Sequence, residues 1–285
     1  MVIRARSRDL GGFSVRRSLP AARRRLVGPF VFFDHMGPLR FEPGRGIDVR
    51  PHPHIGLSTV TYLFEGELFH RDTLGSAQSI RPGDVNWMTA GRGIAHSERT
   101  SPEIRTRGQA YHGIQAWVAL PRDREEGEPS FIHHPQSTLP SLKQNGVELR
   151  VIAGEAYGAR SPVETASPTL YVDAKLDTGA SLELPDGAVE RAFYVASGRV
   201  GCVSDSFDPG DMVVLTRGAR VTVEALEATR LIALGGAPMD GPRYIEWNFV
   251  SSSEERIARA KDDWKRGLFP KIPGDDVEFI PLPER

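Results

Sequence analysis

The chain has 285 residues, of which 39% are hydrophobic and 26% are charged. A chain of this length can bury a sizeable core in one large domain or in two ordinary ones. The formal net charge of -1 gives no reason to expect nucleic acid or an anionic membrane as a partner. Since no stretch approaches the roughly 18 apolar residues of a membrane span, we expect an ordinary globular protein with no membrane partner.

The chain contains a single cysteine, Cys202. One cysteine excludes an intramolecular disulfide and fits a reducing compartment, so we expect a cytoplasmic protein. It also excludes a metal site built from a cysteine cluster. Any metal must therefore be held by nitrogen and oxygen atoms.

The N-terminal 25 residues carry eight arginines and one acidic residue, Asp9. A targeting segment and a solvated first hairpin are both typical of such a pattern. The apolar stretch that follows, residues 26–33, is short and is interrupted by Gly28 and Pro29. This interruption favours the hairpin.

Short apolar runs with alternating polar residues recur along the chain between Gly, Pro and Asp residues. Regularly spaced runs of this kind predict a sandwich or a barrel rather than a βαβ fold. We therefore expect an all-β, mostly antiparallel protein. The predicted strands include residues 58–64, 85–90, 114–120, 147–154, 169–176, 191–198, 212–216 and 220–226.

The two halves of the chain repeat one pattern. In the first half TYLFEGEL precedes RPGDVNWM, and in the second half FYVASGRV precedes DPGDMVVL. Tyr62 corresponds to Tyr194 and Gly66 to Gly198, and a Pro-Gly-Asp turn follows in each case. The order strand, Gly turn, strand, Pro-Gly-Asp turn, strand is thus used twice, which indicates two related β-domains.

The segment between the two repeats is charged and rich in Pro, Gly and Ser, as linkers are. We expect an N-terminal barrel over residues 1–130 and a linker over 131–146. A C-terminal barrel, with a helix and a tail, should then occupy 147–285.

The tail differs from both repeats. Ser252 and Glu255 stand at the spacing of a capping box, which predicts the start of a helix of about three turns. An apolar stripe along one face of this helix should pack on a barrel, and it is formed by Ile257, Ala260 and Trp264.

Two pairs of potential metal ligands have the spacing of a β-strand. His52 and His54 are two residues apart, and so are His96 and Glu98. Because side chains two apart on a strand point the same way, each pair shares a face. Neighbouring strands would combine the pairs into a set of three imidazoles and one carboxylate.

These residues belong to longer motifs. The spacing of the Gly, His and Pro-Gly-Asp positions resembles the two metal-binding motifs of the cupin superfamily, and the positions concerned are Gly46, His52, His54, Gly66, Pro82, Gly83, Asp84, Gly93 and His96. More narrowly, the chain resembles the pirin family, whose members contain two cupin domains. The similar segments are VGPFVFFDHMGP, RPHPHIGLSTVTYLFEGEL, PGDVNWMTAGRGIAHSE and WNFVSSSEERI.

This resemblance implies two jelly-roll barrels in tandem, of which only the N-terminal one binds metal. The ligands that it implies are His52, His54, His96 and Glu98. Thr59 stands where the commoner cupin motif has a Glu, so the carboxylate would come from Glu98. The C-terminal half has no histidine, so its barrel should be free of metal.

Imidazole and carboxylate ligands suit a divalent first-row ion, and we expect iron(II), with nickel, manganese, cobalt, copper and zinc as open alternatives. With one carboxylate, the bound ion would keep a net positive charge that favours an anionic oxygen ligand. This fits the substrate class that the resemblance implies, namely flavonols such as quercetin, which would react with dioxygen. Glu98 would be either a ligand or the general base that takes the hydroxyl proton of the substrate.

The resemblance leaves more than one function open. The first is a dioxygenase of the type that cleaves flavonols between carbons 2 and 3. The second is a redox-responsive regulator that acts through a protein partner, and the third is a protein that keeps a metal for stability alone. We expect a monomer that does not bind nucleic acid directly.

Other polar residues are weaker candidates. His70 and His112 either hydrogen-bond to a ligand or are structural histidines. Gln115 and Trp117 line the pocket or belong to the core. Arg92 orients an anionic substrate or forms a structural ion pair. The neighbouring His133 and His134 fall in the expected linker and should be solvated.

Overall fold

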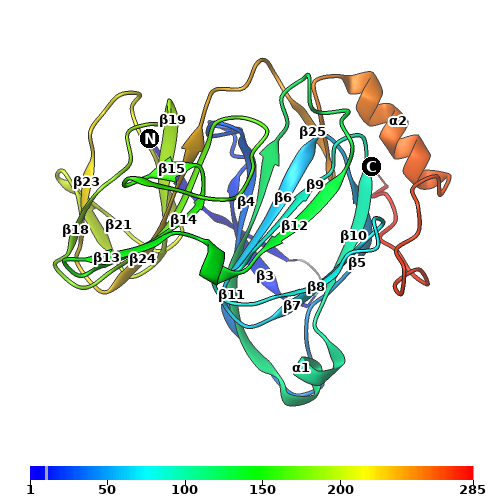
Figure 1. Ribbon diagram of the computed structural model, residues 1–285, viewed down its shortest axis with the longest axis horizontal. Coiled ribbons are helices and arrows are strands. Elements are labelled where there is room, and N and C mark those ends of the chain that lie inside the picture. Colours follow the sequence, from blue (N-terminus) through cyan, green and yellow to red (C-terminus); the bar gives the residue numbers. More distant parts are fainter. Residues whose placement is uncertain (10–11, 285) are drawn as a thin grey trace. The chain divides into compact units, whose positions relative to one another are not determined.

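The computed structural model describes residues 1–9 and 12–284 and consists mainly of antiparallel strands (Figure 1). The described residues include two α-helices, α1 (Pro102–Arg107) and α2 (Glu254–Lys265), and one short 3-10 helix, η1 (Gln136–Thr138). Neither α-helix has the length and apolar character needed to cross a membrane. The expected all-β, mostly antiparallel fold with a C-terminal helix is confirmed.

Contacts divide the chain into two compact units. Unit 1 comprises Met1–His35 and Pro135–Met239, and unit 2 comprises Met36–His134 and Asp240–Arg285. Strand β4 (Phe30–Phe41) contains the first boundary between them.

Unit 2 is a barrel of two antiparallel sheets. One has the order β12-β9-β6-β11, followed by residues 36–41 of β4, and the other has the order β5-β10-β7-β8. Side chains of the two sheets meet inside, because Thr61 on the first donates a hydrogen bond to Glu98 on the second. The strands are β5 (Asp48–His54), β6 (Leu57–Glu65), β7 (Leu68–Asp72), β8 (Ala77–Ile80), β9 (Val85–Thr89), β10 (Ile94–Arg99), β11 (Gln109–Ala119) and β12 (Ser130–His134).

Unit 1 is built in the same way. Its sheets have the orders β1-β22-β19-β24-β17-β14-β13 and β18-β23-β20-β21, and an apolar core fills the space between them. The strands are β1 (Val2–Arg4), β13 (Ser141–Gln144), β14 (Val147–Ala153), β17 (Thr169–Leu176), β18 (Ser181–Glu183), β19 (Glu190–Ser197), β20 (Val200–Cys202), β21 (Asp205–Phe207), β22 (Asp211–Val214), β23 (Thr222–Ala225) and β24 (Thr229–Gly236).

Three short ladders complete the fold. The expected first hairpin is formed by β2 (Arg6–Asp9) and β3 (Ser14–Leu19), of which β2 is exposed whereas Val15, Ser18 and Leu19 of β3 are buried. The other two are the pairs of β15 (Glu155–Ala156) with β16 (Ala159–Arg160) and of β25 (Tyr244–Glu246) with β26 (Phe249–Ser251).

The predicted repeat is present in the strand register. Tyr62 on β6 pairs with Ile114 and Val85, and Tyr194 on β19 pairs with Ile232 and Met212. The two Pro-Gly-Asp turns also share their hydrogen bonds. The glycine of each turn has a positive φ, which is 85° in Gly83 and 100° in Gly210. The N–H of Gly83 donates to the carbonyl of Leu63, and the N–H of Gly210 donates to that of Val195. Both units therefore repeat one pattern of strands and turns.

The compact units differ from the expected division into 1–130, 131–146 and 147–285 at both ends of the chain. The N-terminal residues belong to unit 1, because β1 pairs with β22. The C-terminal residues belong to unit 2. There α2 and β26 form an apolar cluster with Ile55, and Arg99 binds Asp275 of the tail through two hydrogen bonds.

The segment expected as a linker is largely ordered. β12 pairs with β9 and β13 pairs with β14. His133, which we expected to be solvated, is partly buried, and its Nδ1 lies 2.7 Å from the Oδ1 of Asn86. The charged and Pro-rich composition of this segment did not reveal the strand pairings, because strands at the edge of a sheet tolerate polar residues.

The predicted C-terminal helix is confirmed, but its cap is one residue later than expected. The Oγ of Ser253 accepts a hydrogen bond from the N–H of Arg256. Ser252 instead binds Glu125 through both its N–H and its hydroxyl group. Three serines in a row give the sequence no means of choosing among them, and the contact with Glu125 decides the cap.

The repeat assigns a counterpart to Thr59 in the other barrel. Thr59 pairs with Trp117, and the equivalent register position pairs Arg191 with Gly235. Arg191 is 2% exposed, and its guanidinium donates hydrogen bonds to the carbonyls of Pro185 and Ala219. In unit 1 a buried cation thus connects two loops at the position where the commoner cupin motif has a carboxylate ligand.

Replacement of Arg191 by methionine should destabilise unit 1, because it leaves two partly buried carbonyl groups without these donors. We expect the free energy of unfolding to fall by about 2 kcal/mol in chemical denaturation. Arg220→Met is the matched control, since that side chain is 81% exposed and the change should stay within about 0.5 kcal/mol. Equal stabilities of the two variants would contradict this role for Arg191.

Candidate metal centre

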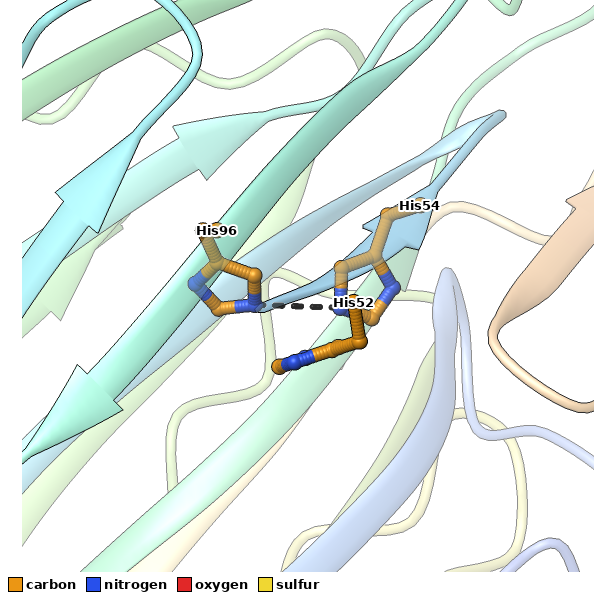
Figure 2. A group of neighbouring side chains, drawn as sticks. All are labelled: His52, His54 and His96. Carbon is orange, nitrogen blue, oxygen red and sulfur yellow. Dashed lines mark hydrogen bonds between the residues drawn. The ribbon is translucent and has the colours of Figure 1, made fainter. Parts of the chain in front are cut away.

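Strand pairing between β5 and β10 brings the predicted histidines together. His52 and His54 point into the barrel from β5, and His96 on β10 is the register partner of His52 (Figure 2). The register then shifts, so that Glu98 pairs with Val49 and β5 has one residue more than β10 between the two pairs. Pro51 lies in this bulge, where its missing N–H is tolerated.

The three imidazoles converge closely enough to share one ion. One ring nitrogen from each of His52, His54 and His96 lies within 4.8 Å of the other two. The Nε2 atoms of His54 and His96 are 3.1 Å apart. Two nitrogens that each bind an ion at about 2.1 Å, at right angles to one another, are about 3.0 Å apart. The spacing therefore fits two adjacent ligands of one metal ion.

Backbone carbonyls fix which nitrogen is available on two of these rings. The Nδ1 of His52 lies 2.9 Å from the carbonyl oxygen of Arg50, and the Nδ1 of His54 lies 3.0 Å from that of Asn248. A carbonyl only accepts hydrogen bonds, so each Nδ1 carries a proton and donates. In a neutral imidazole the Nε2 atom then has a free lone pair, which is the form that binds a metal.

Burial keeps the three imidazoles neutral. It lowers the pKa of His52 to about 4, against the opposing effect of its hydrogen bond to Arg50. It also lowers the pKa values of His54 and His96 well below the usual value, with a further contribution from the neighbouring histidines. Metal binding requires deprotonated ligands, so this site has them ready at neutral pH.

Glu98 lies on the same strand as His96 but is not part of the convergent group of ligand atoms. It is 8% exposed, and its Oε1 accepts a hydrogen bond of 3.0 Å from the hydroxyl of Thr61. Burial raises the pKa of Glu98, and the hydrogen bond from Thr61 opposes this rise. Its role as a metal ligand stays a prediction.

Strands of the facing sheet contribute further side chains to the site. The indole of Trp117 meets the ring of His54 edge-on, with centroids 5.2 Å apart. Thr61 also lies 2.8 Å from the Oε1 of Gln115. Trp117 and Gln115 are thus in contact with residues of the site, and Trp117 also belongs to the buried core, so the two sequence interpretations are not exclusive for it. Thr61 was missed, although its position two residues after Thr59 places it on the same face of β6.

The weaker candidates separate clearly. His70 is in contact with the site, because its Nδ1 lies 3.4 Å from the Nδ1 of His96. His112 packs edge-on against Phe64 instead. Arg92 forms an ion pair with Glu128, in agreement with the structural interpretation.

The buried histidines predict a pH dependence of stability. An unfolded histidine binds a proton near pH 6.5, whereas folded His52 does so only near pH 4. The unfolded state therefore gains protons first as the pH falls, and the folded state loses stability between these values. In the chelator-treated protein we expect the free energy of unfolding to fall by roughly 1 kcal/mol per pH unit from His52 alone.

Chemical denaturation at pH 7.5, 6 and 5 measures this effect. The His52→Gln variant is the comparison, because it lacks the titrating ring and should show a shallower dependence. Identical pH dependences of the variant and the unchanged protein would contradict the assignment of a buried, neutral His52.

Comparison with known proteins supports the same fold. The Pirin family model matches residues 12–118, and the model of the Pirin C-terminal cupin domain matches residues 171–270. A pirin-like protein of Caulobacter vibrioides is 52% identical over 100% of this chain and 99% of its own length. Human pirin is 36% identical over 89% of this chain and 87% of its own length.

A solved structure extends the agreement to three dimensions. The crystal structure of a quercetin 2,3-dioxygenase from Acinetobacter baumannii matches with a TM-score of 0.93 and 34% identity, and the match covers 100% of this chain and 95% of that one. The predicted pair of cupin barrels is thereby confirmed. The chain belongs to the pirin family.

Proposed function

We propose that the protein is a metal-dependent dioxygenase that acts on a flavonol such as quercetin. The convergence of three neutral, buried imidazoles from His52, His54 and His96 carries this proposal. It is supported by the high similarity to a structure described as a quercetin 2,3-dioxygenase. Both the substrate and the activity belong to the proposal.

The donor set suits a divalent first-row transition metal, and iron(II) is our first assignment. Three imidazoles leave open positions on a six-coordinate ion, so that a substrate and dioxygen can approach. A divalent ion held there would supply a positive centre that stabilises an anionic oxygen atom of the substrate. Nickel, manganese, cobalt, copper and zinc are the alternatives, because they also bind nitrogen and oxygen ligands of these kinds.

The exposure of the site residues suggests the direction of substrate entry. His54 and His96 are each 1% exposed, whereas His52 is 7% and Glu98 is 8% exposed. We infer that a flavonol enters at the side of His52 and Glu98. Its acidic hydroxyl group would then arrive beside the carboxylate of Glu98.

We assign Glu98 as the general base that takes this hydroxyl proton. Its carboxylate is separate from the group of converging nitrogen atoms and is held by Thr61. Burial raises its pKa above the usual value, which makes this carboxylate a stronger base than an exposed one. The hydroxyl of Thr61 would keep the carboxylate directed towards the substrate.

The Glu98→Gln variant tests this role. Glutamine retains the size and the hydrogen bond to Thr61 but cannot accept the proton. We expect the metal content to be unchanged and the turnover to fall by about 100-fold or more. Elemental analysis together with steady-state kinetics distinguishes the two roles, because loss of the metal would identify Glu98 as a ligand instead.

Oxygen uptake tests the dioxygenase activity itself. Protein reconstituted with iron(II) should consume dioxygen when quercetin is added, and the His54→Ala variant should not. His133→Ala is the matched control, since this histidine lies on β12 and binds Asn86 outside the site. If the His54 variant and the unchanged protein consume dioxygen equally, the dioxygenase proposal fails. If the unchanged protein binds the metal but consumes no dioxygen with quercetin, the result would favour the alternative function of a regulator that acts through a protein partner.

A further inference from the structure

A chain of buried polar groups runs from the metal centre across the strand pair β10 and β7. His96 pairs in register with Asp72, and Glu98 pairs with His70. The Nδ1 of His96 lies 3.4 Å from the Nδ1 of His70, and the Nε2 of His70 lies 2.9 Å from the Oδ2 of Asp72. His96, His70 and Asp72 are 1%, 3% and 0% exposed, so solvent does not replace these contacts.

The far end of this chain is a fixed acceptor. The Oδ1 of Asp72 accepts hydrogen bonds from the backbone N–H groups of Leu74 and Ser76, at 2.9 and 3.0 Å. Oδ2 is thus left for His70. Because a carboxylate only accepts hydrogen bonds, the Nε2 of His70 must carry a proton and donate it. The ring of His70 is also held in place, since it stacks on Phe131 at 4.3 Å with an angle of 12° between the ring planes.

The acceptor and the contact between the two rings are consistent with one arrangement of protons. With its one proton on Nε2, the ring of His70 has a lone pair on Nδ1. The Nδ1 of His96 then donates to that lone pair. In a neutral His96 the remaining nitrogen, Nε2, has a free lone pair, and this nitrogen lies 3.1 Å from the Nε2 of His54.

We propose that Asp72 and His70 are positioning residues that fix the proton of His96 on Nδ1 and thereby reserve its Nε2 for the metal. Backbone carbonyls hold the proton on the Nδ1 of His52 and of His54. For His96, two side chains would have this role. This inference rests on the proposed metal centre and adds a role for two residues outside the ligand set. The positioning role requires both His70 and Asp72 of β7. Replacement of either residue should therefore weaken metal binding although no ligand is removed.

The Asp72→Asn variant should reverse the direction of the hydrogen bonds from Asp72 through His70 to His96, although it replaces only one oxygen atom by an NH₂ group. The two backbone N–H groups hold the oxygen of the new amide at the position of Oδ1, so its NH₂ group faces His70. His70 must then accept at Nε2 and carry its proton on Nδ1, directed at the N–H of His96. The favoured response of His96 is to move its proton to Nε2, the nitrogen that should bind the metal.

We expect the dissociation constant for zinc(II), measured by competition with a chromophoric chelator, to rise about 10- to 100-fold in Asp72→Asn. The His70→Phe variant keeps a ring to stack on Phe131 but has no acceptor, so it should weaken zinc binding by a similar factor. Asp211→Asn is the matched control, because it makes the same change in the Pro-Gly-Asp turn of unit 1. Its dissociation constant should stay within about threefold of the unchanged protein.

Nitrogen-15 NMR of the zinc-loaded protein gives a readout that a purely structural role would not change. Long-range proton to nitrogen correlations should show His70 protonated on Nε2 in the unchanged protein and on Nδ1 in Asp72→Asn. This measurement on the unchanged protein does not depend on any variant being folded.

The outcomes separate this inference from the proposed function. Tight zinc binding by the unchanged protein, together with equal affinity of both variants, would overturn the positioning role and leave the metal centre intact. A proton on Nδ1 of His70 in the unchanged protein would also overturn it. Failure of the unchanged protein to bind zinc or iron would overturn the metal centre itself, and the positioning role with it.

Discussion

The pairing of β5 with β10 places three imidazoles against one another in a space that water barely reaches, and the chemistry of unit 2 depends on this constraint. Protonated imidazoles would repel one another there, and burial lowers the pKa of each. The rings are therefore neutral, and their lone pairs are directed by partners outside the group. Neutral rings with directed lone pairs at 3.1 Å are favourable when a cation lies between them.

The duplicated barrel shows what the same framework does without such a group. In the second sheet of unit 1, β18 pairs with β23, and Leu182 lies opposite Val223. Both are buried in an apolar core, so this pair offers no ligand atom. Arg191 occupies the position of Thr59 and connects two loops through their carbonyl groups. The barrel of unit 2 thus brings imidazole lone pairs together, whereas the barrel of unit 1 contains the guanidinium group of Arg191.

The sequence predicted the strands and the ligand pairs because both depend on local spacing. Alternation with a period of two marks a strand wherever one face is buried, and the same period puts His52 and His54 on one face. The repeated Pro-Gly-Asp turns were recognisable because a glycine with positive φ is required at the same place in each. The match of longer motifs to the pirin family then implied that the two pairs of potential ligands belong to one metal site.

The parts that the sequence missed depend on contacts between distant segments. Residues 1–35 belong with the second repeat because β1 pairs with β22, more than 200 residues further along the chain, and no local pattern reveals such a pairing. The cap at Ser253 depends on Glu125, which binds the preceding serine. Asp72 was overlooked for the same reason, since its importance arises from its contact with His70 and, through it, with His96.

Anomalous X-ray diffraction from crystals of protein purified without chelators or an affinity-column metal tests the central claim most directly. We predict one anomalous peak at about 2.0 to 2.2 Å from the Nε2 atoms of His52, His54 and His96. Data collected on both sides of the absorption edges would identify the element. Full-occupancy density for the three rings with no peak between them, or a peak only at another site, would contradict the account.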